Sequence, residues 1–276
     1  MRNSRLVMIV SYGSGEMSRF IDHPIKTTAL ENTMDCAQHL STPAVVFRPT
    51  GAPVHTRFLT RFDLPAIVEL EREKWDEVQA ASQSELHNRI DMHPDLSIGA
   101  FCSSTGALLA TLFLKQVADD FHHGVRTWND CTMLPSPKQS SSLFGVSLSS
   151  RSRAGAEALF AFCWPYALKR GWRHVYLGSP VPGLRDWLQT GPESDVEEYA
   201  RACRGGLPLD PQLRYYHARG FDEIIAVKPD YFPHQRSLDY GVLLRHTVPL
   251  SDFGPLWRTL PFGAVQGITR VLRSFT

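Results

Sequence analysis

A basic loop of small residues, between an apolar strand and a helix, is the clearest candidate anion site in this chain. Residues 146–159 read V-S-L-S-S-R-S-R-A-G-A-E-A-L. A loop with few large side chains lets backbone N–H groups approach an anion, and the following helix presents its positive N-terminal end. Arg151 and Arg153 add full positive charge. The pattern predicts a phosphate or pyrophosphate cradle, with tight backbone packing as the alternative reason for the small residues.

Other chemically active residue types form no recognisable site. His122 and His123, near Trp128 and Asp130, match no helix or strand face, so we interpret them as part of a solvated loop and expect no metal site. The chain has no Ser-His-Asp or Cys-His motif, which argues against a covalent hydrolase. Its five cysteines are odd in number and include no C-x-x-C pair, which favours free thiols in a reducing cytoplasm.

The composition is that of an ordinary globular protein. The chain has 276 residues, of which 43% are hydrophobic and 21% charged. With 29 Lys and Arg against 28 Asp and Glu, the net charge of +1 creates no global field to recruit nucleic acid or anionic lipid, so any anion site must be local. We expect no membrane span and a cytoplasmic location, with a secretory signal near residues 6–10 as the less favoured alternative.

The pattern of turn and capping residues predicts one α/β domain over residues 53–246. It follows an irregular, proline-punctuated extension at 1–52 and precedes a tail at 247–276. Asp63 is a suitable N-cap for a helix that ends near Trp75. The expected strands and helices cover, in chain order, residues 54–61, 63–75, 82–91, 96–102, 107–117, 142–149, 154–170, 172–178, 194–203, 210–219, 221–228 and 241–246. A polar loop at 119–141 is expected to separate the first sheet strands from the cradle.

Two of these segments resemble the GNAT acyltransferase superfamily. The superfamily's cradle has Gln or Arg, two residues, Gly, one residue, then Gly or Ala; here Arg151 opens it, Ala154 replaces the first Gly and Ala156 closes it. The segment D-P-Q-L-R-Y-Y-H-A-R-G-F, residues 210–221, is similar to the superfamily's helix that ends in aromatic-Tyr-x-x-x-Gly-Phe. The resemblance implies a GNAT fold, a mixed and mostly antiparallel twisted sheet with helices on both faces. It also implies acetyl-CoA or another acyl-CoA as co-substrate.

The predicted contacts with coenzyme A cover the strand and the cradle. They are Val146, Leu148, Arg151, Ser152, Arg153, Ala154, Gly155 and Ala156. An N–H group of the strand would polarise the thioester carbonyl, and the acceptor would attack it directly.

A more specific resemblance covers residues 54–246. The strings L-x-x-R-x-D-L-P-x-x-x-x-L-E-x-x-x-W, L-x-x-R-I-x-x-H-P, D-P-x-L-R-Y, P-x-Y-x-P and Y-G-V-L-L-R look like the GNAT-like starter-loading domains of modular polyketide synthases. Those domains are associated with decarboxylating malonyl groups and with moving acyl units from coenzyme A to a carrier-protein thiol. Here Tyr216, Ser179 and Phe232 replace their usual His, Thr and Arg. The loss of a cation and of a proton donor disfavours decarboxylation.

The resemblance places Tyr216 where many GNAT enzymes keep the tyrosine that protonates the departing thiolate. A phenol with a pKa near 10 can donate to a thiolate whose thiol has a pKa near 8.5. Ser179, just past a strand, could bind an acceptor or a water, and equally could cap the proline-rich turn. His217 points about 100° away from Tyr216 on the same helix and is a candidate substrate neighbour. Trp75 could line the acceptor side, with a core anchor as the alternative.

The tail shows apolar residues at helical spacing. Ala264, Ile268, Val271, Leu272 and Phe275 would form one stripe that packs on the domain, with a homodimer, carrier-protein or membrane-surface contact as the alternative. The preferred function from the sequence is acyl transfer from coenzyme A to an acyl carrier protein. A small amine acceptor and a non-catalytic acyl-CoA-binding or assembly role are the alternatives.

Overall fold

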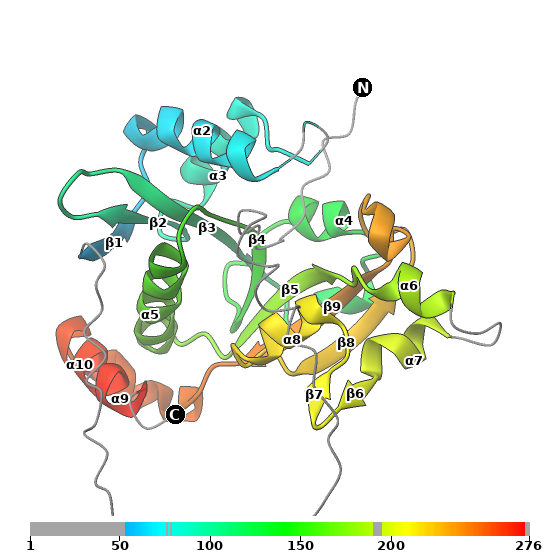
Figure 1. The fold of residues 1–276 in the computed structure, drawn as a ribbon. Coiled ribbons are helices and arrows are strands. Elements are labelled where there is room, and N and C mark those ends of the chain that lie inside the picture. The colour runs from blue at the N-terminus through cyan, green and yellow to red at the C-terminus, as the bar shows by residue number, and fades with distance from the viewer. Residues whose placement is uncertain (1–52, 76, 78, 190–194, 274–276) are drawn as a thin grey trace, which may run out of the picture.

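A computed structural model of the chain describes residues 53–75, 77, 79–189 and 195–273. Its centre is a seven-stranded sheet in the order β1-β2-β3-β4-β5-β9-β8, antiparallel throughout except for the β4–β5 pair (Figure 1). The strands are β1 Val54–Phe58, β2 Ser97–Cys102, β3 Leu108–Val117, β4 Ser142–Ser150, β5 His174–Pro180, β8 Glu223–Lys228 and β9 Gly241–Thr247. A separate two-stranded ribbon pairs β6 Cys203–Arg204 with β7 Leu207–Pro208. The predicted N-terminal extension, residues 1–52, lies outside the described part.

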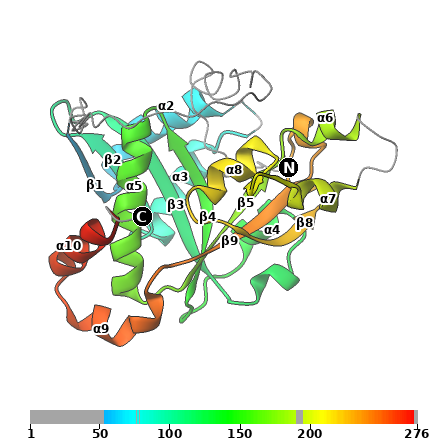
Figure 2. The same ribbon diagram turned by 60° about the horizontal axis from the view of Figure 1, so that its bottom comes forward.

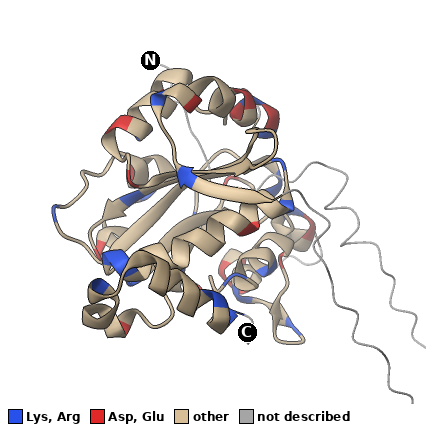
Figure 3. Ribbon diagram, turned by 90° about the vertical axis from the view of Figure 1, so that its left-hand side faces the viewer, with Lys and Arg blue, Asp and Glu red and all other residues tan. Residues whose placement is uncertain are grey.

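Helices cover both faces of the sheet, as Figure 3 shows edge on. The first face carries α2 Leu64–Lys74, α3 Gln83–Met92 and α4 Trp128–Met133, and its core includes Ile67, Trp75 and Phe144. The second face carries α5 Arg153–Arg170, α8 Pro211–His217, α9 Gly254–Thr259 and α10 Phe262–Arg273. The short helices α6 Leu184–Leu188 and α7 Val196–Arg201 lie beyond the end of β5 (Figure 2). We call these the α2/α3 face and the α5 face.

Local signals in the sequence set several of these boundaries. Ser82 and Glu85 form a capping box at the start of α3, with Ser82 Oγ accepting from the Glu85 N–H. Gly171 ends α5 at a φ of 79°, a left-handed conformation that favours glycine over residues with a Cβ. α5 runs through Pro165 as one helix.

The feature that positions the site is the separation of β4 from β5. The two strands pair in parallel only from Ser142 with His174 to Gly145 with Leu177. Beyond that point β4 continues against β3 alone, and β5 continues against β9 (Figure 2). The second half of β4 therefore has one side without a paired strand among the described residues.

Two expectations were wrong in detail. The segment 119–141 contains the short helix α4, whose start is fixed by a Thr127–Asp130 capping box and which buries Trp128 in the core of the α2/α3 face.

In the tail, α10 buries Val265 and Thr269 against the core of the α5 face, whereas Ile268 and Val271 are exposed. The predicted stripe is therefore rotated, and the buried Thr269 hydroxyl is satisfied by donating to the Val265 carbonyl at 2.9 Å. Phe275 lies outside the described residues.

Candidate functional site

The second half of β4 directs backbone polar groups away from β3. The Arg151 N–H donates to the Leu109 carbonyl at 2.9 Å, and Ser150 lies opposite Ala110. Because hydrogen-bonded and non-hydrogen-bonded pairs alternate along antiparallel strands, the N–H and C=O groups of Ser150 and Leu148 point to the side that β5 has left. These groups are suited to bind the amide groups of an extended ligand, as an added strand would.

A β-bulge marks the point where the pairing changes. Phe113 lies opposite Ser147 and Leu114 lies opposite Gly145, so Val146 is an extra residue on β4. A bulge bends its strand and increases the local twist. Val146, predicted to contact coenzyme A, therefore lies where β4 turns away from β5.

The predicted cradle has the expected helix start. Ser152 is the N-cap of α5, and its Oγ accepts from the Gly155 N–H at 3.0 Å. The first N–H groups of a helix have no carbonyl one turn earlier to bond, so the loop keeps donors for an anion. Gly155 also serves packing, because a Cβ there would come within 2.9 Å of the Leu109 Cβ. Ala154, at the superfamily's first glycine position, is exposed, and Ala156 is buried.

Both cradle arginines are engaged with glutamates. An Arg151 Nη lies 2.9 Å from a Glu73 carboxylate oxygen and 3.4 Å from one of Glu69 in α2. Arg153 pairs with Glu157 at 2.7 Å on the exposed side of α5. The exposed Arg153–Glu157 pair contributes little stability, so a pyrophosphate can displace it at low cost, whereas Arg151 is partly buried. The Arg151 Nε is buried and finds no hydrogen-bond partner within the described ranges.

Tyr216 and Ser179 lie on the same face of the sheet. Tyr216 is fully buried in the core of the α5 face, where its ring packs edge to face against Tyr215 and Phe221. Ser179 is also fully buried, and its hydroxyl donates to the Pro180 carbonyl at 2.8 Å, as expected for a residue that caps the turn. His217 is half-buried.

Asp210 fixes α8 to the end of β5. Its Oδ1 accepts from the N–H groups of Gln212 and Leu213 at 2.8 and 3.1 Å, which caps the helix. Its Oδ2 accepts from the Gly183 N–H at 3.0 Å and the Tyr199 hydroxyl at 2.9 Å. Burial raises the pKa of the Asp210 carboxyl, and these four hydrogen bonds oppose the rise because they stabilise the carboxylate. The sequence predicts that a helix starts at Asp210-Pro211. The structure shows in addition that Asp210 bonds to the Gly183 N–H and the Tyr199 hydroxyl beyond the end of β5.

Trp75 belongs to a buried polar group that the sequence did not reveal. Its indole Nε1 donates to Ser149 Oγ at 2.6 Å, and the Ser149 hydroxyl donates to Glu71 Oε2 at 2.7 Å. Glu71 is fully buried at a core position of α2. Trp75 is therefore a core residue, which was the alternative to a place on the acceptor side. Its indole also contacts β4 at Ser149.

Arg89 of α3 reaches the same strand two residues earlier. Its Nη1 donates to Ser147 Oγ at 3.2 Å, and its charge acts on Glu71. Burial raises the pKa of the Glu71 carboxyl, with Arg89 opposing the rise, and burial lowers the pKa of Arg89. The only sequence sign of this pair was a charged residue at an apolar position of the α2 stripe, four residues after Ile67.

Gln212 is a further residue of the site that the sequence did not reveal. It is buried on α8, and its Nε2 has no hydrogen-bond partner in the described part of the chain. Gln212 and Tyr216 are four residues apart and share one face of the helix. An amide nitrogen that is buried without a partner on the Tyr216 face is a candidate ligand contact.

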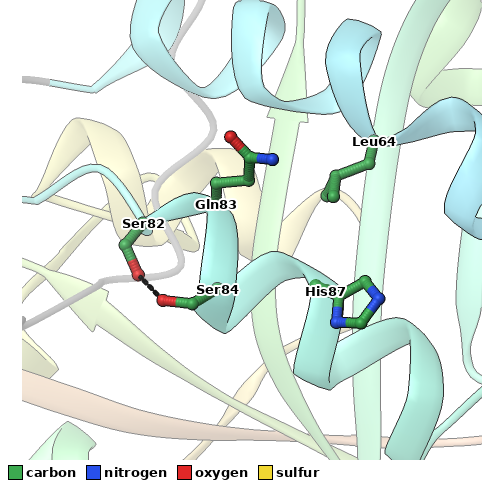
Figure 4. A pocket seen from close by; sticks show the side chains of 5 residues that line it. All are labelled: Leu64, Ser82, Gln83, Ser84 and His87. Atoms are coloured by element: carbon green, nitrogen blue, oxygen red, sulfur yellow. Dashed lines mark hydrogen bonds between the residues drawn. The ribbon is translucent and has the colours of Figure 1, made fainter.

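An open hollow lies elsewhere on the molecule, between the starts of α2 and α3 (Figure 4). Leu64, Ser82, Gln83, Ser84 and His87 line it. The Ser82 hydroxyl is engaged with Glu85 and Ser84, and its role is to cap α3. We assign no acyl chemistry to this hollow.

No family model matches the chain, and no curated protein sequence matches it. Solved structures do match the fold. The loading GNATL domain of CurA from Lyngbya majuscula superposes with a TM-score of 0.61 and 17% identity, over 71% of this chain and 98% of that domain. The GphF GNAT-like decarboxylase in complex with isobutyryl-CoA gives a TM-score of 0.59 and 21% identity, over 70% of this chain and 99% of that one. The chain has the GNAT fold. The predicted fold class and the predicted likeness to loading domains are therefore confirmed.

Two further findings apply to the described part of this GNAT-fold chain. None of its helices there is long and apolar enough to cross a bilayer. Within the same ranges, no three His, Cys, Asp or Glu side chains come together as a metal site.

Proposed function

We propose that the chain transfers an acyl group from an acyl-CoA to an acceptor, preferably the phosphopantetheine thiol of a carrier protein. The observation that carries the proposal is the unpaired side of β4, which presents the Leu148 and Ser150 backbone and leads directly into the α5 cradle. An acyl-pantetheine arm can lie along the strand while its pyrophosphate reaches the helix start. GphF, which has the same fold, is described in complex with isobutyryl-CoA.

The chemistry proposed is direct attack on the thioester. The acceptor nucleophile attacks the carbonyl carbon, and an N–H of β4 stabilises the negative charge that develops on the oxygen. The bond between the acyl carbon and sulfur breaks, and Tyr216 donates its phenolic proton to the departing sulfur. The fixed position of α8, which Asp210 ties to the end of β5, supports a defined place for that phenol.

Decarboxylation is not part of the proposal. Phe232, at the position of the loading domains' arginine, is buried against Tyr231 in the core of the α2/α3 face. Tyr216 and Ser179 replace the other two residues associated with that chemistry. With no cation at position 232, the substrate carboxylate lacks the partner that the loading domains provide.

Intact-protein mass spectrometry of a holo carrier protein tests the proposal. The full chain is incubated with the carrier and acetyl-, malonyl- or isobutyryl-CoA, and we expect the carrier to gain the mass of the acyl group. The apo carrier, which lacks the thiol, is the control. Acylation of a small amine with an unchanged carrier would identify the acceptor as an amine. Calorimetric binding of acyl-CoA with no transfer to either would indicate a non-catalytic binder, and no binding would overturn the proposal.

A further inference from the structure

The Glu71 carboxylate is fully buried in the described part of the protein. It lies at a core position of α2, in line with Leu64, Ile67 and Leu70 on the helix face that packs on the sheet. Burying a carboxylate costs several kcal/mol, and a leucine of similar volume would avoid that cost. Packing alone therefore does not explain the acid at this position.

The hydrogen bonds of Glu71 lead to β4. Oε1 accepts from the Ala81 N–H at 3.4 Å, a long bond, and Oε2 accepts from the Ser149 hydroxyl at 2.7 Å. Ser149 in turn accepts from the Trp75 indole at 2.6 Å. A hydroxyl oxygen has two acceptor lone pairs, so Ser149 can accept one further hydrogen bond while it donates to Glu71.

The position of Ser149 in the sheet indicates a function for the hydrogen bonds that link Trp75, Ser149 and Glu71. Ser149 lies on β4 between Leu148 and Ser150, beyond the point where β5 leaves. Its side chain is on the α2/α3 face, whereas Tyr216 packs on the α5 face. In direct transfer, the attacking group must lose a proton, and the departing sulfur must gain one. A proton acceptor on the α2/α3 face and a proton donor on the α5 face would separate those two events.

We propose that the Ser149 hydroxyl and the Glu71 carboxylate form a relay that removes the proton of the attacking nucleophile. The inference rests on the proposed acyl transfer. As the bond between the nucleophile and the acyl carbon forms, the nucleophile's proton moves to Ser149 Oγ, and the Ser149 proton moves to Glu71 Oε2. The bond between the acyl carbon and sulfur breaks, and the sulfur takes the Tyr216 proton. Glu71 ends protonated and Tyr216 ionised, and exchange with water restores both.

The charges around Glu71 suit this role. Burial raises the pKa of Glu71, and Arg89 of α3 is the charged group that opposes the rise. Glu85, also on α3, acts on Arg89 in turn. A carboxyl whose pKa lies above the ordinary value of about 4.3 is a stronger base than an exposed glutamate. The Arg89 charge favours the ionised form of Glu71 and so opposes the effect of burial.

The test is the pH dependence of transfer from acetyl-CoA to N-acetylcysteamine and to a holo carrier protein. In the wild type, kcat/KM should rise with pH as Glu71 ionises, above the ordinary glutamate range. Glu71→Gln keeps the side-chain shape and should lower kcat/KM about 100-fold and remove that acidic limb. A role limited to packing would leave the limb in place.

Ser149→Ala gives a second test that leaves both the Glu71 and the Arg89 charges in place. It should lower kcat/KM about as much as Glu71→Gln with little change in the affinity for coenzyme A, and Ser149→Thr should restore part of the rate. Ser147→Ala is the matched control, because Ser147 is equally buried two residues away and binds Arg89 instead. It should keep the acidic limb and the rate within a few-fold.

The outcomes separate the relay from the proposed function. If the wild type transfers acyl groups and Ser149→Ala behaves like Ser147→Ala, or Glu71→Gln keeps the acidic limb, the relay is wrong and acyl transfer stands. If the wild type transfers to neither thiol nor to a small amine, the relay and the proposed function fail together. Thermal unfolding of each variant shows whether a lost rate reflects lost structure.

Discussion

The two faces of the sheet surround β4 with different chemistry. On the α5 face, aliphatic and aromatic side chains enclose Tyr216, and the helix start of the cradle lies at the end of the strand. On the α2/α3 face, a buried carboxylate and a partly buried guanidinium reach the same strand through Ser149 and Ser147. A ligand that lies along β4 would therefore meet an apolar face with a proton donor on one side. On the other side it would meet a charged face with a proton acceptor.

The largest expected effect is on the stability of the α2/α3 face. Arg89→Met leaves Glu71 buried without its charged neighbour and should lower the free energy of unfolding by about 3 kcal/mol at pH 8. Without Arg89, the pKa of Glu71 in the folded state lies even further above its unfolded value. The folded state of the variant then binds the Glu71 proton more tightly than the unfolded state does. The loss of stability relative to the wild type should therefore be smallest at low pH. It should grow as the pH rises from the pKa of Glu71 in the unfolded state to its pKa in the folded state.

Urea unfolding of Arg89→Met between pH 4.5 and pH 8 checks this. Arg61→Met is the matched control, because Arg61 bonds Asp91 with two hydrogen bonds of 2.8 Å on the exposed surface, and its loss should hardly move the unfolding midpoint. Adding Glu71→Leu to Arg89→Met should recover most of the lost stability. A deficit independent of pH would contradict the assignment of the buried charge.

The next effect tests the proton-donating side. Tyr216→Phe keeps the ring that packs on Tyr215 and Phe221 but removes the proton, so acyl transfer should slow about 100-fold with little change in coenzyme A binding. Tyr215→Phe is the control on the adjacent position, where Arg219 stacks on the ring at 3.5 Å. Steady-state rates and calorimetry give the two readouts. Equal rates for Tyr216→Phe and the wild type would remove Tyr216 from the mechanism.

The cradle should show a smaller effect, confined to binding. Charge reversal of Arg151 and Arg153 should weaken coenzyme A binding about tenfold, or about 1.4 kcal/mol, because two cations next to the helix start become anions. Arg201→Glu is the control, since Arg201 pairs with Glu197 at 2.6 Å on the distant helix α7. Isothermal calorimetry measures each affinity. If the double variant binds as tightly as the wild type, the pyrophosphate lies elsewhere.

The sequence predicted the α5 face better than the α2/α3 face. Gly171 after α5 and Asp210 before α8 are cap and turn signals that depend on neighbours in sequence, and the helix end at 170 and the helix start at 210 were predicted correctly. The splay after Gly145 and the bulge at Val146 depend on which strands pair, which no local pattern records. The Glu71–Ser149 bond joins residues 78 positions apart, and a glutamate in a helix normally predicts an exposed face. Long-range polar contacts of this kind emerge only from the folded structure.

The smallest effect tests whether the α5 face also holds a ligand contact. Gln212 Nε2 is buried with no partner among the described residues, and an unsatisfied buried donor destabilises a protein by about 1 kcal/mol or more. Gln212→Met keeps the length of the side chain and should raise the free energy of unfolding by about 1 kcal/mol, measured by urea unfolding. Gln83→Met at an exposed position of α3 should change it little. If the amide meets a carbonyl of the bound acyl-pantetheine arm, the same variant should bind acyl-CoA more weakly. Opposite signs for stability and affinity would show that the donor is kept for a ligand, whereas a loss of stability would show that the amide has a structural partner.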